Sequence, residues 1–183
     1  ILSGVGIHSG KQVSLKCIPK ESGGICFIRT DLNNQKIHVH PLNIAGSNRA
    51  TIIKENNHAI YTPEHLLSAL AGLEITHLDI EIDQAEVPIL DGSALSFTSE
   101  FQKASLKTLQ KEKKIYKIKK ELTISKDDSW IKLIPSTKHE IEYTLSYPNH
   151  FIKTQSMKTI LTPDTYCSDI APARTYGFEH EIK

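Results

Sequence analysis

The sequence predicts an α+β protein, in which groups of short strands are followed by helices. Apolar and polar residues alternate in several short runs, which is typical of half-buried strands. Thr62-Pro63 and Thr162-Pro163 each follow such a group and open a helical pattern, with Thr as the expected N-cap and Pro at the first helical position. Strands grouped before helices favour α+β over a doubly wound parallel sheet.

The first half of the chain has five predicted strands and two predicted helices. The strands are residues 13–16, 25–28, 51–53, 59–61 and 78–82, with a turn at Asn56-Asn57. From Pro63 onward, Leu66, Leu67, Leu70 and Leu73 recur on one helical face, and Gly72 is expected to loosen the end of this helix. A second helix opens at Asp91-Gly92-Ser93, where Ser93 is the expected N-cap.

The second half repeats this order after a lysine-rich linker at residues 109–114. Predicted strands at 116–124, 130–134, 140–147 and 157–161 precede a helix that begins at Thr162-Pro163-Asp164. We therefore expect an N-terminal α+β domain at 1–110 and the first part of a similar domain at 115–183. A cleft between such halves is a preferred place for a ligand.

Composition excludes several classes of function. A net charge of +1 argues against a nucleic-acid partner, and the eight lysines of residues 103–120 are better explained by a solvated linker than by a phosphate-steering surface. No apolar run approaches the roughly 20 residues that cross a bilayer. The three cysteines, Cys17, Cys26 and Cys167, lack C-x-x-C spacing and indicate free thiols in a reducing compartment. We expect a cytoplasmic protein without a transmembrane segment.

Glu64 and His65 are the leading candidates for chemistry, because they lie in the first turn of a helix whose later turns are anchored by leucines. Unpaired N–H groups and the positive end of the helix dipole favour an ionised Glu and a neutral His there. Such a carboxylate is a possible base and such an imidazole a possible metal ligand. On spacing alone, capping electrostatics and a solvated histidine are the commoner explanation of such a pair, and no standard zinc signature contains it.

Other residues are less informative. His38 and His40 share one strand face, which indicates an exposed polar face rather than a chelate. His8 follows a glycine-rich turn, and Asp91 either caps a helix or supports a site. The chain has no phosphate-binding loop and no G-x-G-x-x-G pattern, so a kinase or Rossmann function has no support.

Four segments occur together and in order: Gly4-Val5-Gly6-Ile7-His8-Ser9-Gly10, Thr62-Pro63-Glu64-His65-Leu66, Glu86-Val87-Pro88-Ile89-Leu90-Asp91-Gly92-Ser93 and Ala173-Arg174-Thr175-Tyr176-Gly177-Phe178. With them the chain strongly resembles the UDP-3-O-acyl-N-acetylglucosamine deacetylases, the zinc enzymes of lipid A biosynthesis. The resemblance implies two similar sheet-plus-helix domains packed as a β-α-α-β sandwich, with the active site between them.

The resemblance also implies roles for individual residues. His65 is similar to the first zinc ligand and Glu64 to the general base that accepts a proton from the metal-bound water. Thr175 is similar to the threonine that stabilises the oxyanion. Tyr176 and Phe178 match aromatic positions that line the substrate, a UDP-linked acylated amino sugar; the family more usually has Phe in place of Tyr176.

The remaining zinc ligands of the family, a His and an Asp, lie on a downstream His-Lys-x-x-Asp motif, and no His-x-x-x-Asp occurs after Phe178. The chain thus carries one of three expected ligands and resembles the N-terminal portion of the enzyme. Two alternatives follow. Either residues elsewhere complete a zinc deacetylase, or the chain is a catalytically incomplete fragment, a sugar-nucleotide-binding remnant unable to hold zinc.

Overall fold

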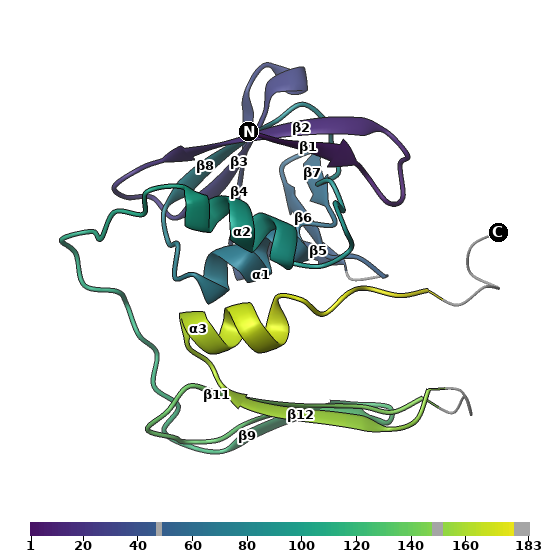
Figure 1. Cartoon of the computed structure of the whole chain (residues 1–183), viewed down its shortest axis with the longest axis vertical. Helices are drawn as coiled ribbons and strands as arrows, with labels where there is room; N and C mark the ends of the chain where they lie inside the picture. The colour runs from purple at the N-terminus through teal and green to yellow at the C-terminus, as the bar shows by residue number, and fades with distance from the viewer. Residues whose placement is uncertain (47–48, 148–151, 178–183) are drawn as a thin grey trace. The chain divides into compact units, whose positions relative to one another are not determined.

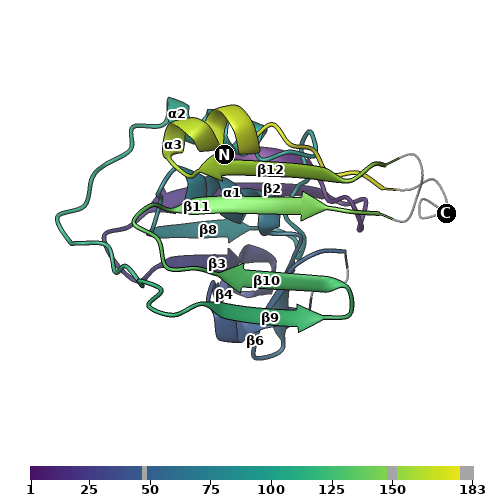
Figure 2. The same cartoon turned by 90° about the horizontal axis from the view of Figure 1, so that it is seen from below.

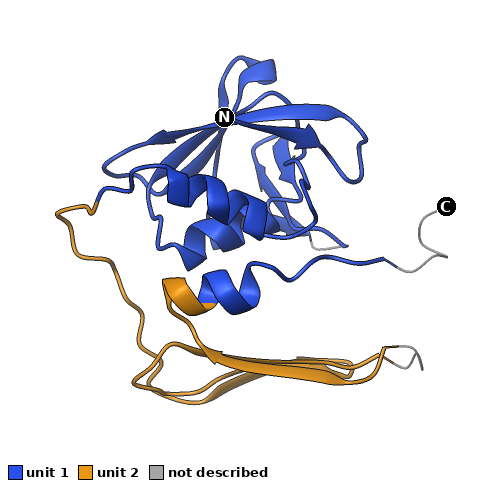
Figure 3. Ribbon diagram, viewed as in Figure 1, with its two compact units in different colours: residues 1–107, 166–183 blue, residues 108–165 orange. Residues whose placement is uncertain are grey.

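The structure, a computed structural model, describes residues 1–46, 49–147 and 152–177. It forms two compact units, residues 1–107 with 166–183 (unit 1) and residues 108–165 (unit 2), coloured separately in Figure 3. The structure thus groups the segment after residue 165 with the first half of the chain, because that segment is hydrogen-bonded to it. The predicted domains at 1–110 and 115–183 and their sandwich arrangement stay predictions.

Unit 1 contains a five-stranded sheet in the order β1-β2-β8-β3-β4. Its strands are β1 (Leu2–Val5), β2 (Gln12–Pro19), β3 (Ile25–Arg29), β4 (Gln35–His38) and β8 (Leu78–Ile82). Only β3 and β8 pair in parallel. In β8 the alternation is strict, since Leu78, Ile80 and Ile82 are buried while the two acidic residues between them are half-buried. The predicted strands at 13–16, 25–28 and 78–82 are confirmed.

A second, three-stranded sheet of unit 1 has the order β5-β6-β7. Its strands are β5 (Ile44–Gly46), β6 (Ile52–Glu55) and β7 (His58–Tyr61). The predicted Asn56-Asn57 turn joins β6 to β7, and Asn56 adopts a left-handed φ of 55°. Short 3₁₀ turns, η1 (Thr30–Leu32) and η2 (Pro41–Asn43), flank β4.

Two helices, α1 (Glu64–Gly72) and α2 (Leu95–Lys103), lie on one face of the five-stranded sheet (Figure 1). From α1, Leu66 and Leu70 are fully buried as the leucine stripe predicts, whereas Leu67 and Leu73 are only half-buried. Phe97 of α2 is also completely buried. This apolar layer between helices and sheet anchors α1 beyond its first turn.

Both ends of α1 differ from the sequence-based prediction. The helix begins at Glu64 with Pro63 as its N-cap, and the hydroxyl of Thr62 does not cap it. At the other end, Glu74 adopts a left-handed φ of 57°, and the N–H groups of Glu74 and Ile75 donate to the carbonyls of Ala71 and Leu70, which is the Schellman arrangement. The expectation that Gly72 loosens the helix end is therefore wrong.

After a single helical turn, α3 (Pro163–Thr165), the chain continues as η3 (Tyr166–Ile170), which has π-helical geometry. Tyr166 is buried in unit 1, where its hydroxyl lies 2.8 Å from Oγ of Ser68 on α1. A Cβ at Gly72 would lie 2.2 Å from the Tyr166 ring. Gly72 thus makes room for the tyrosine that docks the segment after residue 165.

Unit 2 consists of two antiparallel hairpins, whose strands Figure 2 shows. They are β9 (Leu122–Lys126) with β10 (Ser129–Leu133), and β11 (Glu140–Leu145) with β12 (Gln155–Ile160). The strand predicted at 116–124 begins only at Leu122. Thr162 acts as the predicted N-cap, because its Oγ1 accepts the N–H of Thr165 at 3.2 Å.

The lysine-rich stretch before β9 is almost entirely exposed and, after α2 ends, forms neither helix nor strand, as expected of a linker. The α+β class is confirmed. Within the described ranges, each helix is too short or too polar to span a bilayer.

Candidate active site

Glu64 and His65 occupy the first two positions of α1 and are both half-buried. The carboxylate Oε2 of Glu64 accepts the backbone N–H of Thr51 at 3.1 Å, which ties the helix start to the residue before β6. Pro63 precedes them in a helical conformation, and its carbonyl accepts the N–H of Leu67 at 2.8 Å. The pair is therefore held on a rigid element, with its side chains at the helix end that favours negative charge.

Thr62, directly before this proline, has a φ of 54°, a conformation that a β-branched residue rarely adopts. Its N–H donates to the carbonyl of Thr51 at 3.0 Å, and its hydroxyl donates to Oε1 of Glu86 at 3.2 Å. The Thr62 hydroxyl, which was expected to cap α1, therefore donates its hydrogen bond to Glu86, a residue distant in sequence.

Glu86 is only 4% exposed although it is acidic. Besides the Thr62 hydroxyl, it accepts the backbone N–H groups of His8 at 2.9 Å and Ser9 at 2.7 Å. Burial alone would raise the pKa of this carboxyl, but hydrogen bonds from Ser9, His8 and Thr62 outweigh burial and hold the pKa below its ordinary value. Glu86 is therefore a buried, ionised and fully bonded side chain.

A pocket of about 380 Å³ opens beside Glu86. Its lining residues come from the β1–β2 turn, from β6 and the segment before it, from β7, and from the loop after β8: His8, Ser9, Lys11, Ala50, Ile52, Tyr61, Gln84, Ala85 and Glu86. Of the predicted site residues that the structure describes, Glu64, His65, Thr175 and Tyr176, none lines it. The histidine whose role the sequence left open, His8, thus lies on a pocket and is fixed there through its backbone.

Thr175 is held to the loop that precedes α2. Its N–H donates to the carbonyl of Gly92 at 2.7 Å, and nearby the N–H of Ala94 donates to the carbonyl of Ala171 at 3.1 Å. Gly92 has a φ of 83°, and a Cβ there would lie 3.6 Å from the Thr175 methyl carbon. No described hydrogen bond joins Thr175 to Glu64 or His65, so the structure places all three in unit 1 without pairing them.

The Asp91 carboxylate organises the same loop. It accepts the hydroxyls of Ser93 at 2.8 Å and Ser96 at 2.9 Å, while Oγ of Ser93 accepts the N–H of Leu95 at 3.0 Å. Desolvation opposes ionisation of Asp91, but these bonds prevail and its pKa lies below the ordinary value. The N-cap of α2 is Ala94, so the predicted N-cap Ser93 stands one residue too early, although its Oγ accepts the N–H of the first helical residue, Leu95.

Of the two aromatic residues predicted to line the substrate, the structure describes only Tyr176. Tyr176 directly follows Thr175 and is 50% exposed, so its ring is accessible. Phe178 lies outside the described residues. The exposure of Tyr176 is compatible with stacking against a ligand, and its predicted role stays a prediction.

The predicted zinc site requires several His, Cys, Asp or Glu side chains close to His65. Across residues 1–46, 49–147 and 152–177, no three His, Cys, Asp or Glu side chains gather closely enough to hold a metal ion. A catalytic zinc centre takes three protein ligands, so His65 with its described neighbours does not fit one.

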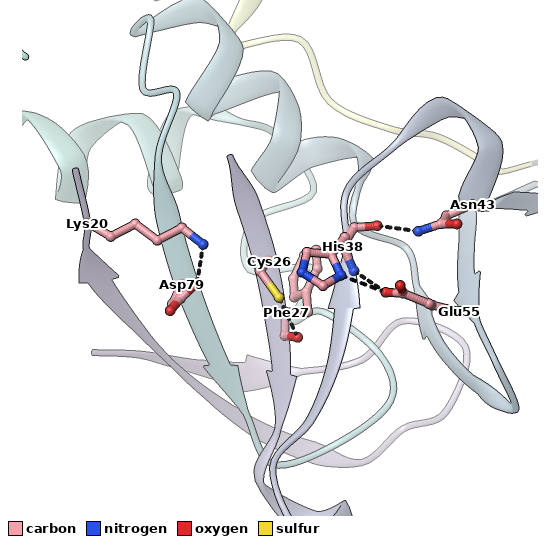
Figure 4. Close-up of polar contacts among 7 residues, drawn as sticks. All are labelled: Lys20, Cys26, Phe27, His38, Asn43, Glu55 and Asp79. Carbon is pink, nitrogen blue, oxygen red and sulfur yellow. Dashed lines mark hydrogen bonds and ion pairs between the residues drawn. The ribbon is translucent and has the colours of Figure 1, made fainter. Parts of the chain in front are cut away.

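His38 and His40 have other partners. Nδ1 of His38 lies 2.9 Å from Oε2 of Glu55, which also accepts the backbone N–H of His38 at 2.7 Å (Figure 4). The same two bonds hold the pKa of the Glu55 carboxyl below its ordinary value. Nδ1 of His40 accepts the N–H of Leu42 at 3.2 Å. His38 is the last residue of β4, whereas His40 is the N-cap of η2, so the two histidines do not share a strand face as predicted.

The sequence predicted no role for Glu86, although its carboxylate joins the turn at His8 and Ser9 to Thr62. A signal was present, because an acidic residue stands between Ala85 and the apolar Val87-Pro88 pair. A carboxylate in such surroundings is buried only when several donors satisfy it.

The chain was compared with known proteins. The UDP-3-O-acyl-N-acetylglucosamine deacetylase of Oleidesulfovibrio alaskensis is 37% identical over 183 residues, which cover 99% of this chain and 60% of that protein. Proteins of the same name from Syntrophus aciditrophicus and Helicobacter pylori are 38% and 35% identical, over 98% and 99% of this chain and 58% and 61% of their own lengths. The chain therefore spans about three-fifths of these relatives.

These relatives define the class: they are deacetylases. The model of one family, described as LpxC, UDP-3-O-acyl N-acetylglycosamine deacetylase, matches residues 1–183. The chain belongs to this family, as its four sequence segments predict.

Proposed function

We propose that the protein to which this chain contributes is a zinc-dependent deacetylase that removes the N-acetyl group of a UDP-linked, 3-O-acylated N-acetylglucosamine in lipid A biosynthesis, and that it acts in the cytoplasm. The observation that carries the proposal is family membership over the whole chain, together with a Glu-His pair at the start of an anchored helix. His65 is proposed as one zinc ligand. At least one of the other ligands would have to come from outside the described residues, because these contain no group of three donors.

Glu64 is proposed as the general base. It occupies the first turn of α1, and the bond from the Thr51 N–H fixes one of its oxygens. The other oxygen would accept a proton from the attacking water and later pass it to the departing amine, since a positioned carboxylate can serve both steps.

Thr175 is proposed to donate its hydroxyl to the oxyanion that forms when water adds to the acetyl carbonyl. A donor contributes to catalysis when its position is fixed before charge develops. The 2.7 Å bond from the Thr175 N–H to Gly92 supplies such fixation, and exposure of Thr175 leaves it accessible. Tyr176 and Phe178 are proposed to line the sugar and nucleotide portion of the substrate.

A second candidate function is a sugar-nucleotide-binding protein that does not hold zinc. The lack of a three-donor group among the described residues favours it. Acetate release with bound zinc would exclude this candidate, whereas binding of the nucleotide sugar without zinc or acetate release would support it.

The test uses the complete protein that contains this chain, with bound zinc, acetate release and substrate affinity measured for each variant. Glu64→Gln should lower kcat by about 10²–10⁴ and retain zinc, because it removes the base and leaves the ligands. His65→Ala should lose zinc first. Glu100→Gln and His58→Ala remove matching groups elsewhere in unit 1 and should change neither quantity.

Loss of zinc in Glu64→Gln with retention in His65→Ala would reverse the two roles. Full activity in both Glu64→Gln and His65→Ala would refute the assignment of these two residues to the active site.

A further inference from the structure

The Glu86 carboxylate joins two segments that are far apart in sequence. Oε2 accepts the N–H of Ser9, while Oε1 accepts both the N–H of His8 and the hydroxyl of Thr62. On either side of Glu86, the N–H of Tyr61 donates to the carbonyl of Ala85 at 2.8 Å, and the N–H of Val87 donates to the carbonyl of Tyr61 at 3.0 Å. The segment around Glu86 therefore holds the end of β7 by both main chain and side chain.

The β1–β2 turn is built around this carboxylate. The turn is closed by hydrogen bonds from the Gly6 N–H to the Lys11 carbonyl at 3.0 Å and from the Gly10 N–H to the Gly6 carbonyl at 2.9 Å. A Cβ at Gly6 would lie 2.4 Å from Oε2 of Glu86. Only glycine allows the backbone to approach the carboxylate so closely, and His8 is presented by the resulting turn.

At the other end of the link, Thr62 is held in a left-handed conformation that its own side chain disfavours. The φ and ψ angles of Thr62 set the direction in which Pro63 leaves β7 and hence where α1 begins. Such a conformation persists only when surrounding bonds enforce it. The bonds of Thr62 to Thr51 and Glu86 do so.

We propose that Glu86 is a positioning residue for the active site: its carboxylate fixes the left-handed turn at Thr62 that orients Glu64 and His65, and at the same time fixes the turn that carries His8. The proposal rests on the proposed deacetylase function for its catalytic consequence. A carboxylate suits this position because it only accepts hydrogen bonds and can serve the N–H groups of His8 and Ser9 together with the hydroxyl of Thr62. A glutamine of the same shape has one acceptor oxygen and an NH₂ group that would face a backbone N–H.

The experiment compares Glu86→Gln with Asp83→Asn in the complete protein. Asp83 is the matched control, because its carboxylate accepts the backbone N–H of Ser14 at 2.8 Å and belongs to the same loop but reaches neither Thr62 nor the His8 turn. Per zinc-loaded, folded molecule, Glu86→Gln should lower kcat about 10- to 100-fold with little change in KM, and Asp83→Asn less than about twofold.

Thr62→Val is a second route that leaves the turn bonds of Glu86 intact and removes only the Thr62 link. It should also lower kcat, and combining it with Glu86→Gln should reduce kcat by less than the product of the two single effects, since both break the same link. A lower melting temperature with unchanged kcat per folded molecule in both single variants would show a merely structural role and overturn the proposal.

Amide hydrogen exchange separates this proposal from the proposed function. Exchange at Ser9 and Thr62 should accelerate in Glu86→Gln and stay unchanged in Asp83→Asn. If the unaltered protein releases no acetate, the deacetylase function fails, and the exchange rates alone decide whether Glu86 holds both segments. Unchanged exchange at both amides would overturn the positioning function whatever the activity.

Discussion

Two carboxylates of unit 1, Glu86 and Asp91, each accept several hydrogen bonds from neighbouring backbone and hydroxyl groups. Hydrogen bonds lower the pKa of each below its ordinary value despite desolvation. A carboxyl with a lowered folded pKa stabilises the fold fully at pH values above its unfolded pKa, and this stabilisation is lost as the pH falls through the folded value. The contribution of Glu86 and Asp91 to the stability of both loops is therefore complete at neutral pH and is lost in acid.

At the residue scale, Thr175→Val tests the oxyanion assignment, because valine keeps the shape of threonine and lacks the hydroxyl. If the hydroxyl serves charge that appears only in the transition state, kcat of the complete protein should fall by roughly 10- to 1,000-fold with nearly constant KM. The backbone bond to Gly92 is unaffected by this change, so the segment should stay in place.

Turnover and melting temperature measured on the same Thr175→Val preparation distinguish catalysis from structure. A structural hydroxyl would lower the free energy of unfolding by about 1 kcal/mol or more and leave kcat per folded molecule intact. That result would remove Thr175 from the catalytic residues.

At the scale of secondary structure, local pattern predicted strands that carry an apolar run or an apolar–polar alternation, such as β8 and the four strands of unit 2, and missed β1, β4 and β5. Burial does not separate the two groups, because the strands of unit 2 have no buried residue, whereas the missed β4 buries Ile37. The missed strands are held by backbone pairing to a neighbour that lies elsewhere in the sequence. Such pairing leaves no periodic signal.

The two Thr-Pro pairs show the same limit for the candidate site. Thr162 caps its helix as predicted, while the hydroxyl of Thr62 donates to Glu86. The local sequences are alike, and the difference lies in a carboxylate 24 residues away that only the fold brings near. Local signals predicted Glu64 and His65 as candidates, whereas the contact between Thr62 and Glu86 left no local signal.

The docking of Tyr166 against α1 gives a prediction at this scale. In Gly72→Ala the new Cβ would lie 2.2 Å from the Tyr166 ring, too close unless the ring or the helix shifts. Although alanine favours helices, we expect the free energy of unfolding to fall by about 1–3 kcal/mol. Ala71→Gly changes an exposed position of the same helix turn and should cost only about 1 kcal/mol through helix propensity alone.

Urea unfolding of both variants measures these differences, and tyrosine fluorescence or an aromatic NMR shift reports whether the Tyr166 ring moves. A stabilised Gly72→Ala protein with an unmoved ring would contradict the packing of η3 on α1.

On the scale of the whole molecule, unit 1 contains Glu64, His65 and the segment that carries Thr175, and the last of these reaches unit 1 from beyond residue 165. The family match covers the whole chain, while the chain covers about three-fifths of its relatives. The family match and the available metal-binding side chains therefore lead to different expectations for zinc. Zinc is predicted from the sequence resemblance, whereas the described residues of this chain supply one proposed ligand without two companions.

The zinc content of the 183-residue chain alone follows from these available side chains. We expect it to bind zinc weakly or not at all, because a single imidazole lacks the three protein ligands of a catalytic centre. Equilibrium dialysis with metal analysis measures the stoichiometry, and the complete protein, expected to hold one zinc that His65→Ala removes, is the positive control. Tight, stoichiometric zinc in the 183-residue chain would contradict the assignment and direct attention to His38, His40 and Cys167. His38 would then have to exchange its contact with Glu55 for the metal, so zinc binding would be coupled to rearrangement of β4 and β6.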